Sequence, residues 1–512
     1  MKNVGIMAMR AFLAAVLLLG TAAVANADYE LDYGVSLTAN AGGGDFAPTY
    51  MSSNVHGVLT QPYSTLLRAS VSRKMDYDKR FSYGFGVDVI GGYFSKTDYL
   101  RFDAGDALPH EHSEGPAPIW LQQLYAELKY RGVYFTFGMK EWGSVLLNNS
   151  LSSGDLTFSG NSRPIPEVRI GFFDFEDIPF TNGWVQIRGA LSYGINMDDK
   201  WLENHYNYET SYVTTNSWYN YKYVHFRTNP DKPFSFLIGM QAACQFGGTY
   251  KEYDNGNLVK TEDGTLKVKD FLYALIPMQQ SGSSYYEGNH IGSWDVMGRY
   301  RFKDGKEIKA YYQSLWEDGS GIGKLNGFDG LYGLEFKNDK EGIVDGVVVE
   351  YIDFTNQSGP LHWAPGDFDD GYLIPTPATG ADDYYNNFFY NGYTRYGMSI
   401  GSPFVKSTIY NTDGYMRITD NRIRGFHVGV SGHLFDGFSY RLLASYRKSW
   451  GSSMVPTIEK THTASMLVEG VYEFENVPGL QVKGQFAFDS GDLYGNNTGV
   501  LVSVSYRGLL NL

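Results

Sequence analysis

The sequence is almost free of cysteine, since Cys244 is the only one in 512 residues. An intrachain disulfide is therefore excluded. In residues 234–246, aromatic and aliphatic side chains alternate with small or polar ones, and Cys244 falls on the apolar face. We interpret this cysteine as a small apolar filler without a redox role.

Long apolar runs are also missing after residue 25. A membrane-spanning helix needs about 20 consecutive apolar residues, and the mean hydropathy of the chain is −0.30. The chain is nevertheless rich in aromatic residues and glycine, with 41 Tyr, 32 Phe and 60 Gly. These features favour a transmembrane β-barrel, in which outward apolar residues alternate with inward polar ones. The alternative is a soluble β-sandwich, and Cys244 would face lipid only in the barrel.

Motifs of catalysis are absent as well. No G-x-S-x-G segment stands between a strand and a helix, and no Walker loop is present. His110-Glu111-His112 lacks the H-E-x-x-H spacing of zinc proteases. Residues 367–370 (DFDD) hint at calcium but lack the spacing and the terminal Glu of an EF-hand loop. We expect no catalytic residue, no metal, no cofactor and no nucleic-acid partner.

The one long apolar run stands at the N-terminus. Lys2 and Arg10 provide positive charge before the apolar residues 11–25, and Ala25-Asn26-Ala27 fits an A-x-A cleavage site. We expect residues 1–27 to be a signal peptide cleaved after Ala27. No cysteine follows that site, so a lipid-anchored start is not expected. Residues 28–512 are then a single barrel domain.

Strand periodicity is clearest near the C-terminal end. In residues 498–508, Val500 and Val502 alternate with Leu501 and Ser503. Such alternation between turn residues is the pattern of antiparallel strands and hairpins. Similar segments number about 18, within the range of large outer-membrane barrels. Residues 29–38 are a further candidate strand.

The order of short turns and long loops has one inconsistency. Outer-membrane barrels alternate short periplasmic turns with longer outer loops. If residues 395–401 form a strand, the short turns that follow it fall at the wrong end. Either residues 404–416 contain one more strand or one earlier strand is assigned wrongly. We place residues 196–218, 249–289 and 356–391 in outer loops.

Two stretches do not alternate. Residues 140–171 contain Trp142 and the closely spaced Pro164 and Pro166, a composition typical of irregular backbone. We predict that residues 141–167 form an irregular loop that folds into the lumen and occludes it. In residues 41–63, Ser52-Ser53-Asn54 are suited to cap a short helix, and a plain surface loop is the alternative.

Several of these segments resemble a known family. Trp142-Gly143, followed by Asn161-Ser162-Arg163-Pro164-Ile165-Pro166, resembles the outer-membrane capsule-assembly family Wzi, in the form found in Bacteroides-like bacteria. The resemblance continues through residues 170–194 and 391–404. It implies an 18-stranded outer-membrane barrel, a small helical element on the periplasmic side within residues 41–63, and capsular polysaccharide as partner.

One group of candidate binding residues surrounds the irregular loop. Alternation turns Lys140 and Arg188 towards the lumen, and a loop folded inward would add residues with charged, amide or aromatic side chains. Such a surface can hydrogen-bond an anionic or hydroxyl-rich chain, with Arg as a bidentate carboxylate partner. The alternative is a salt-bridge network that only fills the barrel, because buried polar groups must pair in any case. The group comprises Lys140, Trp142, Asn161, Arg163, Glu167, Arg169 and Arg188.

A second group lies in aromatic segments of the expected outer loops. Flat aromatic rings beside Asn and Asp are suited to sugars, because apolar sugar faces stack on rings and hydroxyls bond to polar groups. The alternative is an aromatic girdle, which places the same residue types at the membrane edge. The group comprises Trp201, Tyr206, Trp218, Asp382, Tyr384 and Tyr385.

Together these features predict an outer-membrane, lectin-like protein. We expect it to bind exported capsular polysaccharide and to assist capsule assembly and attachment at the cell surface, without being an enzyme. Expected partners are the polysaccharide, outer-membrane lipid and the capsule export machinery, and we expect a monomer. The alternative is a porin-like channel for small solutes, and a barrel enzyme acting on lipid or glycan is a weaker third hypothesis.

Overall fold

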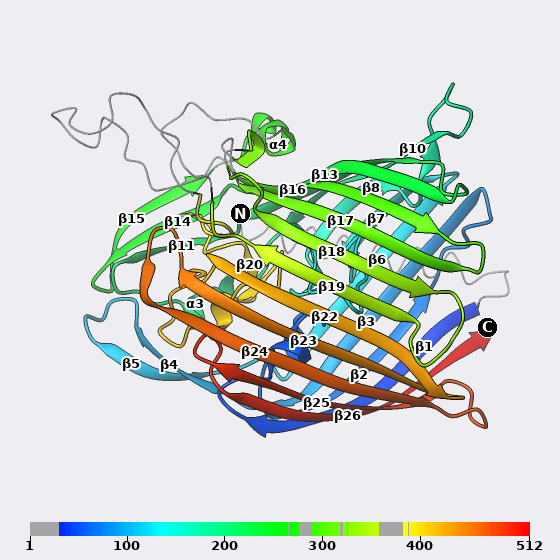
Figure 1. Cartoon of the computed structure of the whole chain (residues 1–512). Coiled ribbons are helices and arrows are strands. Elements are labelled where there is room, and N and C mark those ends of the chain that lie inside the picture. Colours follow the sequence, from blue (N-terminus) through cyan, green and yellow to red (C-terminus); the bar gives the residue numbers. More distant parts are fainter. Residues whose placement is uncertain are drawn as a thin grey trace.

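The chain forms one large antiparallel sheet that closes on itself (Figure 1). The computed structural model describes residues 30–264, 266–276, 288–317, 321–324, 326–357, 382–387 and 389–511. Strand β1 (Glu30–Gly43) pairs with both β2 (Ser64–Arg73) and β26 (Asn497–Asn511), which closes the barrel. The expected barrel of about 18 strands is confirmed, and the β-sandwich alternative is wrong. The predicted signal peptide and its cleavage site lie outside the described residues.

Eighteen strands form the barrel wall in the described part of the chain. The two-residue β9 (Glu176–Asp177) continues the side of β10 that β8 pairs with. The remaining barrel strands are β3 (Phe81–Phe94), β6 (Ile119–Tyr130), β7 (Val133–Met139), β8 (Pro166–Phe172), β10 (Val185–Ile195), β12 (Trp218–Thr228), β13 (Phe234–Phe246), β16 (Asn289–Arg301), β17 (Lys306–Glu317), β18 (Gly330–Asn338), β19 (Gly346–Asp353), β22 (Ile423–Phe435), β23 (Phe438–Gly451), β24 (Pro456–Glu473) and β25 (Leu480–Gly491).

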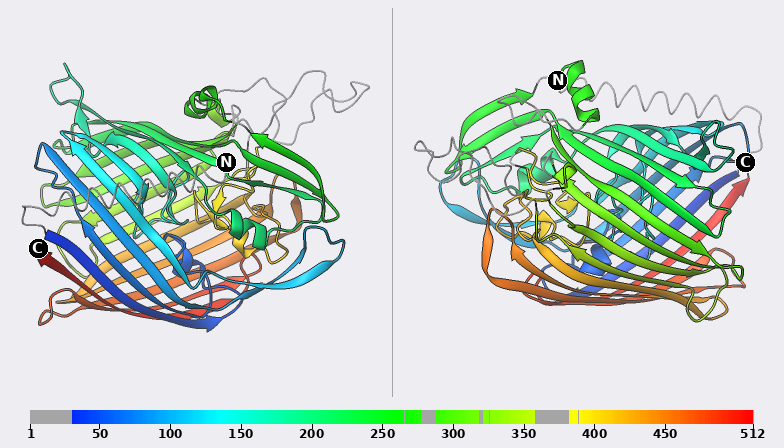
Figure 2. Two further views of the ribbon diagram at one scale, coloured as in Figure 1. Left: turned by 180° about the vertical axis from the view of Figure 1, so that it is seen from behind. Right: turned by 45° about the horizontal axis from the view of Figure 1, so that its top comes forward.

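The two ends of the barrel differ in the length of their connections (Figure 2). Both described termini lie at one end, where Glu30 is paired with Asn511 and the turns between strands are short. We call this the terminal end. The opposite end, here the loop end, carries the long connections, including residues 140–165 and 354–422. Since short turns face the periplasm in such barrels, the loop end corresponds to the outer face.

The connections at the loop end contain the remaining elements. They form a hairpin of two strands, a three-stranded sheet, a short hairpin and a few helical turns. These elements are α2 (Thr49–Ser52), β4 (Thr97–Phe102), β5 (Pro109–Glu114), α3 (Asp199–His205), β11 (Ser211–Thr215), β14 (Gly248–Asp254), β15 (Asn257–Gly264), α4 (Val268–Leu275), β20 (Thr394–Arg395), β21 (Met398–Ser399) and η3 (Thr408–Tyr410). No helix among the described residues is both long and apolar enough to cross a membrane.

The inconsistency in the order of turns has a simple origin. Residues 395–401 are not a barrel strand, because β19 pairs directly with β22. They overlap instead with the small hairpin β20–β21 of residues 394–399, whose two turn residues, Tyr396 and Gly397, have φ of 47° and 70°. These are the left-handed dihedrals of a type I′ turn, which suits a two-residue hairpin. Without a barrel strand at residues 395–401, short turns and long loops alternate as expected. Residues 404–416 contain no strand either.

Inward and outward side chains alternate as predicted on the C-terminal strands. Val500 and Val502 are each 51% exposed on the outer surface, whereas Ser503 is 7% exposed and faces the lumen. The exposed apolar residues of neighbouring strands continue this outer surface around the barrel. It is the apolar surface that lipid requires.

Cys244 is an exception to the expected lipid contact. It lies on the outward-facing side of β13 but is fully buried, because α4 covers this part of the wall. Ala274 of α4 and Phe246 pack in the same apolar cluster. The prediction that Cys244 faces lipid is therefore wrong, although it does pack as a small apolar filler.

The helix predicted within residues 41–63 is displaced from its expected place. Helix α2 spans Thr49–Ser52, so Ser52-Ser53-Asn54 lie at and beyond its end, and Pro48 is the residue before its start. It lies inside the barrel, in a connection of the loop end, and not on the periplasmic side. Backbone and side-chain bonds hold it there: the Thr49 N–H donates to Asp489 at 2.8 Å, and the Tyr50 hydroxyl lies 2.6 Å from His427 Nδ1.

Candidate functional site

Two chain segments fill the lumen and together form what we call the lumen plug. The first, residues 140–165, joins β7 to β8, and the second comprises residues 382–387 and 389–422. Asn161 Nδ2 donates to the Ser399 carbonyl at 3.0 Å, and the Tyr385 hydroxyl donates to a carbonyl of the first segment at 2.8 Å. The two segments therefore support each other across the barrel. Of the loop expected at residues 141–167, residues 141–165 lie in the lumen, whereas Pro166 and Glu167 already belong to strand β8.

A buried carboxylate fastens the lumen plug to the wall. Asp155 accepts hydrogen bonds from the Ser144 hydroxyl at 2.7 Å and from the side-chain amides of Gln313 and Gln241 at 3.0 and 3.1 Å. Burial, together with the nearby charge of Asp295, raises the pKa of Asp155. The several donors offset part of this cost, and they fix the position of the first segment.

The expected lumen residues near β7 and β8 pair with one another. Lys140 Nζ lies 2.6 Å from Glu127 Oε2 and 4.7 Å from the ring centroid of Trp142. Arg169 and Glu167 form an ion pair at 2.7 Å, with both side chains 2% exposed. This arrangement matches the salt-bridge network weighed as the alternative to ligand binding.

Aromatic rings enclose the buried pair further. The guanidinium of Arg169 lies 4.5 Å from the ring centroid of Trp142 and 5.5 Å from that of Phe158, both in the lumen plug. Arg188 lies on the neighbouring β10, and its Nε has no hydrogen bond within the described residues. Arg169 thus joins the plug to the wall, and neither Arg169 nor Arg188 lines either of the two cavities described below.

Arg163 is held between two aromatic rings and has no ion pair within the described residues. Its guanidinium carbon lies 4.2 Å from the ring centroid of Trp120 and 4.6 Å from that of Tyr396. Within the described ranges no hydrogen bond or ion pair engages this guanidinium. Burial lowers its pKa from the ordinary value. The two rings hold the plane of the guanidinium and leave its N–H groups available.

A pocket of about 280 Å³ opens beside Arg163 at the loop end. Trp201 of α3 lines it, and its ring stacks on His205 at 4.1 Å with an interplanar angle of 17°. Lys200 and Glu114 contribute one charge of each sign. Burial lowers the pKa of His205 to about 4, so this imidazole is neutral at neutral pH. We call this the outer pocket, and it brings together Arg163 and Trp201, which were predicted from separate segments.

The tight β20–β21 turn positions Trp201. A Cβ on Gly397 would lie 2.3 Å from the Trp201 ring, whereas a Cβ on Gly495, which also has a positive φ, would meet nothing within 4 Å. We expect Gly397→Ala to destabilise the barrel by roughly 1–3 kcal/mol more than Gly495→Ala, because overpacking adds to the backbone strain that both share. Urea unfolding with tryptophan fluorescence measures both. Equal losses would mean that Trp201 moves aside freely.

The other predicted sugar-binding residues have structural roles. Asn161, Tyr384 and Tyr385 are completely buried, so their side chains offer no face to a sugar. Asp382 is 9% exposed. Tyr206 is buried and its hydroxyl lies 2.7 Å from Ser211 Oγ, and Trp218 packs against Phe246 and Phe271 on the outer wall.

The histidines of the β4–β5 hairpin also have ordinary partners. His110 lies 2.9 Å from Asp106 and His112 lies 3.0 Å from Asp103. Throughout the described residues no group of three His, Cys, Asp or Glu side chains is arranged to hold a metal ion. The acidic residues 367–370 lie outside the described residues.

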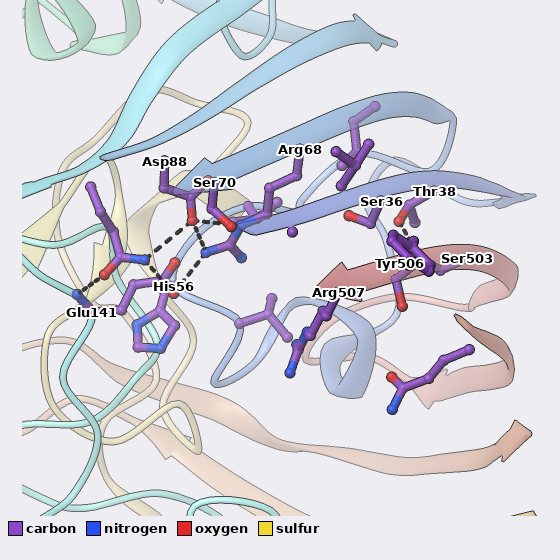
Figure 3. Close-up of a pocket in the computed structure, with 18 of the residues that line it drawn as sticks. Ser36, Thr38, His56, Arg68, Ser70, Asp88, Glu141, Ser503, Tyr506 and Arg507 are labelled. Atoms are coloured by element: carbon purple, nitrogen blue, oxygen red, sulfur yellow. Dashed lines mark hydrogen bonds and ion pairs between the residues drawn. The ribbon is translucent and has the colours of Figure 1, made fainter. Parts of the chain in front are cut away.

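A larger cavity of about 610 Å³ lies inside the barrel towards the terminal end (Figure 3). We call it the lumen cavity. Arg68 stands on one side of it, paired with Asp88 through Nε at 2.8 Å and with Glu141 at 2.8 Å. Ser36 of β1 is paired in register with Arg68 of β2, and Thr38, Ser503 and Arg507 lie further along the same wall. Met51, Val55, Val58, Leu59, Leu66 and Leu501 supply its apolar lining.

Alternation turns Gln123 and Tyr125 towards the lumen, but sequence reasoning named no polar residue of the lumen cavity among the final candidate binding residues. Most polar residues of the cavity come from β1, β2, β3, β25 and β26, which join the two ends of the chain, and the others include His56, Gln123, Tyr125 and Glu141. The available signal was the inward face of each strand, rich in Ser and charged residues. It could have identified the cavity only if the barrel closure between β1 and β26 had been used to put these faces side by side.

Comparisons with known proteins agree with the fold. No family model and no curated protein matches the chain. The structure is similar to that of Wzi, an outer-membrane protein involved in group 1 capsule assembly in Escherichia coli and described as a carbohydrate-binding β-barrel. The identity is 9%, the match covers 92% of this chain and 83% of that chain, and the TM-score is 0.55.

Porins of Pseudomonas aeruginosa also match. OprD has 8% identity and a TM-score of 0.42, with 94% of this chain and 95% of that chain covered. OpdK with vanillate has 10% identity and a TM-score of 0.44, with 94% and 98% covered. At these identities the likenesses show the fold alone, which is that of outer-membrane β-barrels.

Proposed function

We propose that this protein binds exported capsular polysaccharide at the outer face of the outer membrane and so assists the assembly and attachment of a capsule. The observation that carries the proposal is Arg163, clamped between Trp120 and Tyr396 beside the outer pocket and without an anionic partner in the described residues. The carbohydrate binding described for the E. coli Wzi barrel is consistent with this function.

The chemistry of the outer pocket suits an acidic sugar. A guanidinium binds a carboxylate through two parallel hydrogen bonds, and its flat faces stack well on aromatic rings. Arg163 has both rings in place, so little further ordering is needed when an anion arrives. The half-buried Trp201 ring beside it can stack against the apolar face of a sugar unit. A uronate residue of a polymer supplies both groups.

The charge of the whole chain makes a local cation important. The formal net charge is −14, which repels an acidic polymer at long range, although salt screens this repulsion beyond about 10 Å. Binding therefore depends on cations placed where the polymer docks, and in the outer pocket these are Arg163 and Lys200. A channel for small solutes is the other hypothesis, and the lumen plug argues against it.

The test is binding of a polyuronate, polygalacturonate, and of the host's own capsular polysaccharide to the refolded barrel. We expect Arg163→Ala to weaken binding by roughly 10- to 100-fold, because a charge-assisted hydrogen bond to a ligand contributes about 1.5–3 kcal/mol. The affinity of Arg163→Lys should lie between those of Arg163→Ala and the unaltered protein, since Lys keeps the charge and loses the bidentate geometry.

The matched control is Arg424→Ala, which removes an arginine whose side chain is 48% exposed and paired with Asp353. It should leave binding unchanged. If Arg163→Ala and Trp201→Ala both bind polygalacturonate as tightly as the unaltered protein, the outer pocket is not the binding site.

A further inference from the structure

The lumen cavity is separate from the outer pocket and has a different lining. It is about 610 Å³ in volume, within the range of roughly 300–1,000 Å³ that small-molecule sites occupy. Asp32 and Arg507, which line it, stand near the beginning of β1 and the end of β26. The cavity therefore belongs to the terminal end of the barrel, on the opposite side of the lumen plug from the outer pocket.

Hydroxyl groups cover one wall of this cavity. Ser36 is paired with Ser505 across β1 and β26, and Thr38 is paired with Ser503. Ser70 and Ser72 of β2 continue the wall on the other side of β1. Neighbouring strands lie about 4.8 Å apart and alternate inward residues about 6.6 Å apart. The result is a regular field of hydroxyls.

Most of these hydroxyls are free to meet a ligand. Thr38 Oγ1 and Ser503 Oγ lie 2.7 Å apart and bond to each other (Figure 3). For Ser36, Ser72 and Ser505, no side-chain hydrogen bond exists within the described part of the chain. A hydroxyl both donates and accepts, so these groups can match the hydroxyls of a sugar.

The cations of the cavity are not balanced by its acids. Arg68 is held by Asp88 and Glu141, and Lys74 lies 3.1 Å from Asp32. Lys483 and Arg507 remain, and neither has an ion pair among the described residues.

The acid that attracts Lys483 most strongly is shared with a second cation. Glu469, on the neighbouring strand β24, is bound by Arg441 through two contacts of 3.0 Å. The lining therefore carries an excess of positive charge in a chain whose formal net charge is −14.

The cations and hydroxyls also meet in register. Lys483 is paired directly with Ser503, Gln481 is paired with Ser505, and Arg507 follows two residues after Ser505 on the same inward face. A carboxylate between Lys483 and Arg507 would therefore have serine hydroxyls along both strands beside it. Few hydroxyl-rich ligands other than sugar acids place a carboxylate next to several hydroxyls.

We infer that the lumen cavity is a second binding site, which takes a sugar acid or the acidic end of an oligosaccharide from the terminal end of the barrel. Lys483 and Arg507 contact the carboxylate, and the serine and threonine hydroxyls of β1, β2 and β26 contact the sugar hydroxyls. The inference does not depend on the outer pocket, because the residues that carry it lie on other elements.

The test is calorimetric titration of the refolded barrel with D-glucuronate and with D-glucose as the neutral counterpart. All proteins carry Arg163→Ala, so that the guanidinium of the outer pocket does not contribute. We expect saturable binding of glucuronate and none of glucose. Lys483→Gln with Arg507→Gln should weaken glucuronate binding at least ten-fold. The control is Lys460→Gln with Arg80→Gln, which removes two exposed cations outside the cavity and should not change glucuronate binding.

A second variant tests the contacts to the sugar hydroxyls separately from the contacts to the carboxylate. Ser503→Val with Ser505→Val should weaken glucuronate binding at least five-fold while leaving the weak binding of acetate unchanged. This variant keeps all charges and tests the site even if the cation variant fails to fold. The inference is overturned if glucuronate gives no saturable heat, or if both cavity variants bind it as the control does. Neither result bears on binding of polygalacturonate at Arg163.

Discussion

Replacing residues 140–165 with an Asn-Gly turn should convert the barrel from a closed protein into an open channel. Met139 and Pro166 are paired at the ends of β7 and β8, so a two-residue turn can join these strands without moving them. The removed segment carries Asp155, Asn161 and the carbonyls that hold the second segment of the lumen plug. Without it, that second segment loses its support in the lumen.

Barrels with 16 to 18 strands leave an aqueous channel when nothing fills them. In planar lipid bilayers we therefore expect discrete single-channel steps for the turn variant, and none for the unaltered protein. The matched control is Asp436→Asn, which makes the same Asn-Gly pair in the short β22–β23 turn and leaves the lumen plug in place. Circular dichroism confirms that each protein is folded.

Either deviation from this result is informative about function. If the unaltered protein already conducts ions in discrete steps, the channel hypothesis replaces the polysaccharide-binding one. If the turn variant is folded but gives no single-channel steps, the second segment of the lumen plug closes the barrel by itself. That segment contains Tyr384, Tyr385 and Tyr393, each 1% exposed or less, and would then be the next part to remove.

The wall of the barrel could be predicted from the sequence because each strand is a local pattern. Lipid outside and polar groups inside impose a period of two residues on every strand. Val500 and Val502 are assigned correctly for this reason. The strand expected at residues 395–401 is wrong because apolar residues also alternate in a short hairpin whose strands are buried in the lumen. The sequence of one segment does not distinguish such a hairpin from a strand of the barrel wall.

The candidate site was predicted only in part because it depends on tertiary contacts. Arg163 and Trp201 were both identified, but nothing local indicated that the two share a pocket. Arg163 and Arg169 look alike in the sequence, yet one lacks an anionic partner among the described residues and the other is paired with Glu167. Tyr384 and Tyr385 looked suitable for sugars because a buried tyrosine and a sugar-binding tyrosine have the same neighbours in sequence.

The ion pair of Arg169 and Glu167 gives the largest expected effect on stability. Arg169→Met should lower the free energy of unfolding by about 3–5 kcal/mol, because it leaves the Glu167 carboxylate buried without its cation. Glu167→Gln combined with Arg169→Met removes both charges, and it should recover most of that loss. Urea unfolding of the refolded barrel in detergent measures both variants.

Arg424→Met is the matched control for this prediction. Its partner is Asp353 at 2.8 Å, and the arginine side chain is 48% exposed, so its loss should cost about 0–1 kcal/mol. If Arg169→Met costs no more than Arg424→Met, water reaches the pair and the lumen plug is looser than its burial indicates. Polygalacturonate binding should survive in the Glu167→Gln, Arg169→Met protein, because that pair supports the lumen plug from behind, whereas Arg163 is the cation that faces the outer pocket.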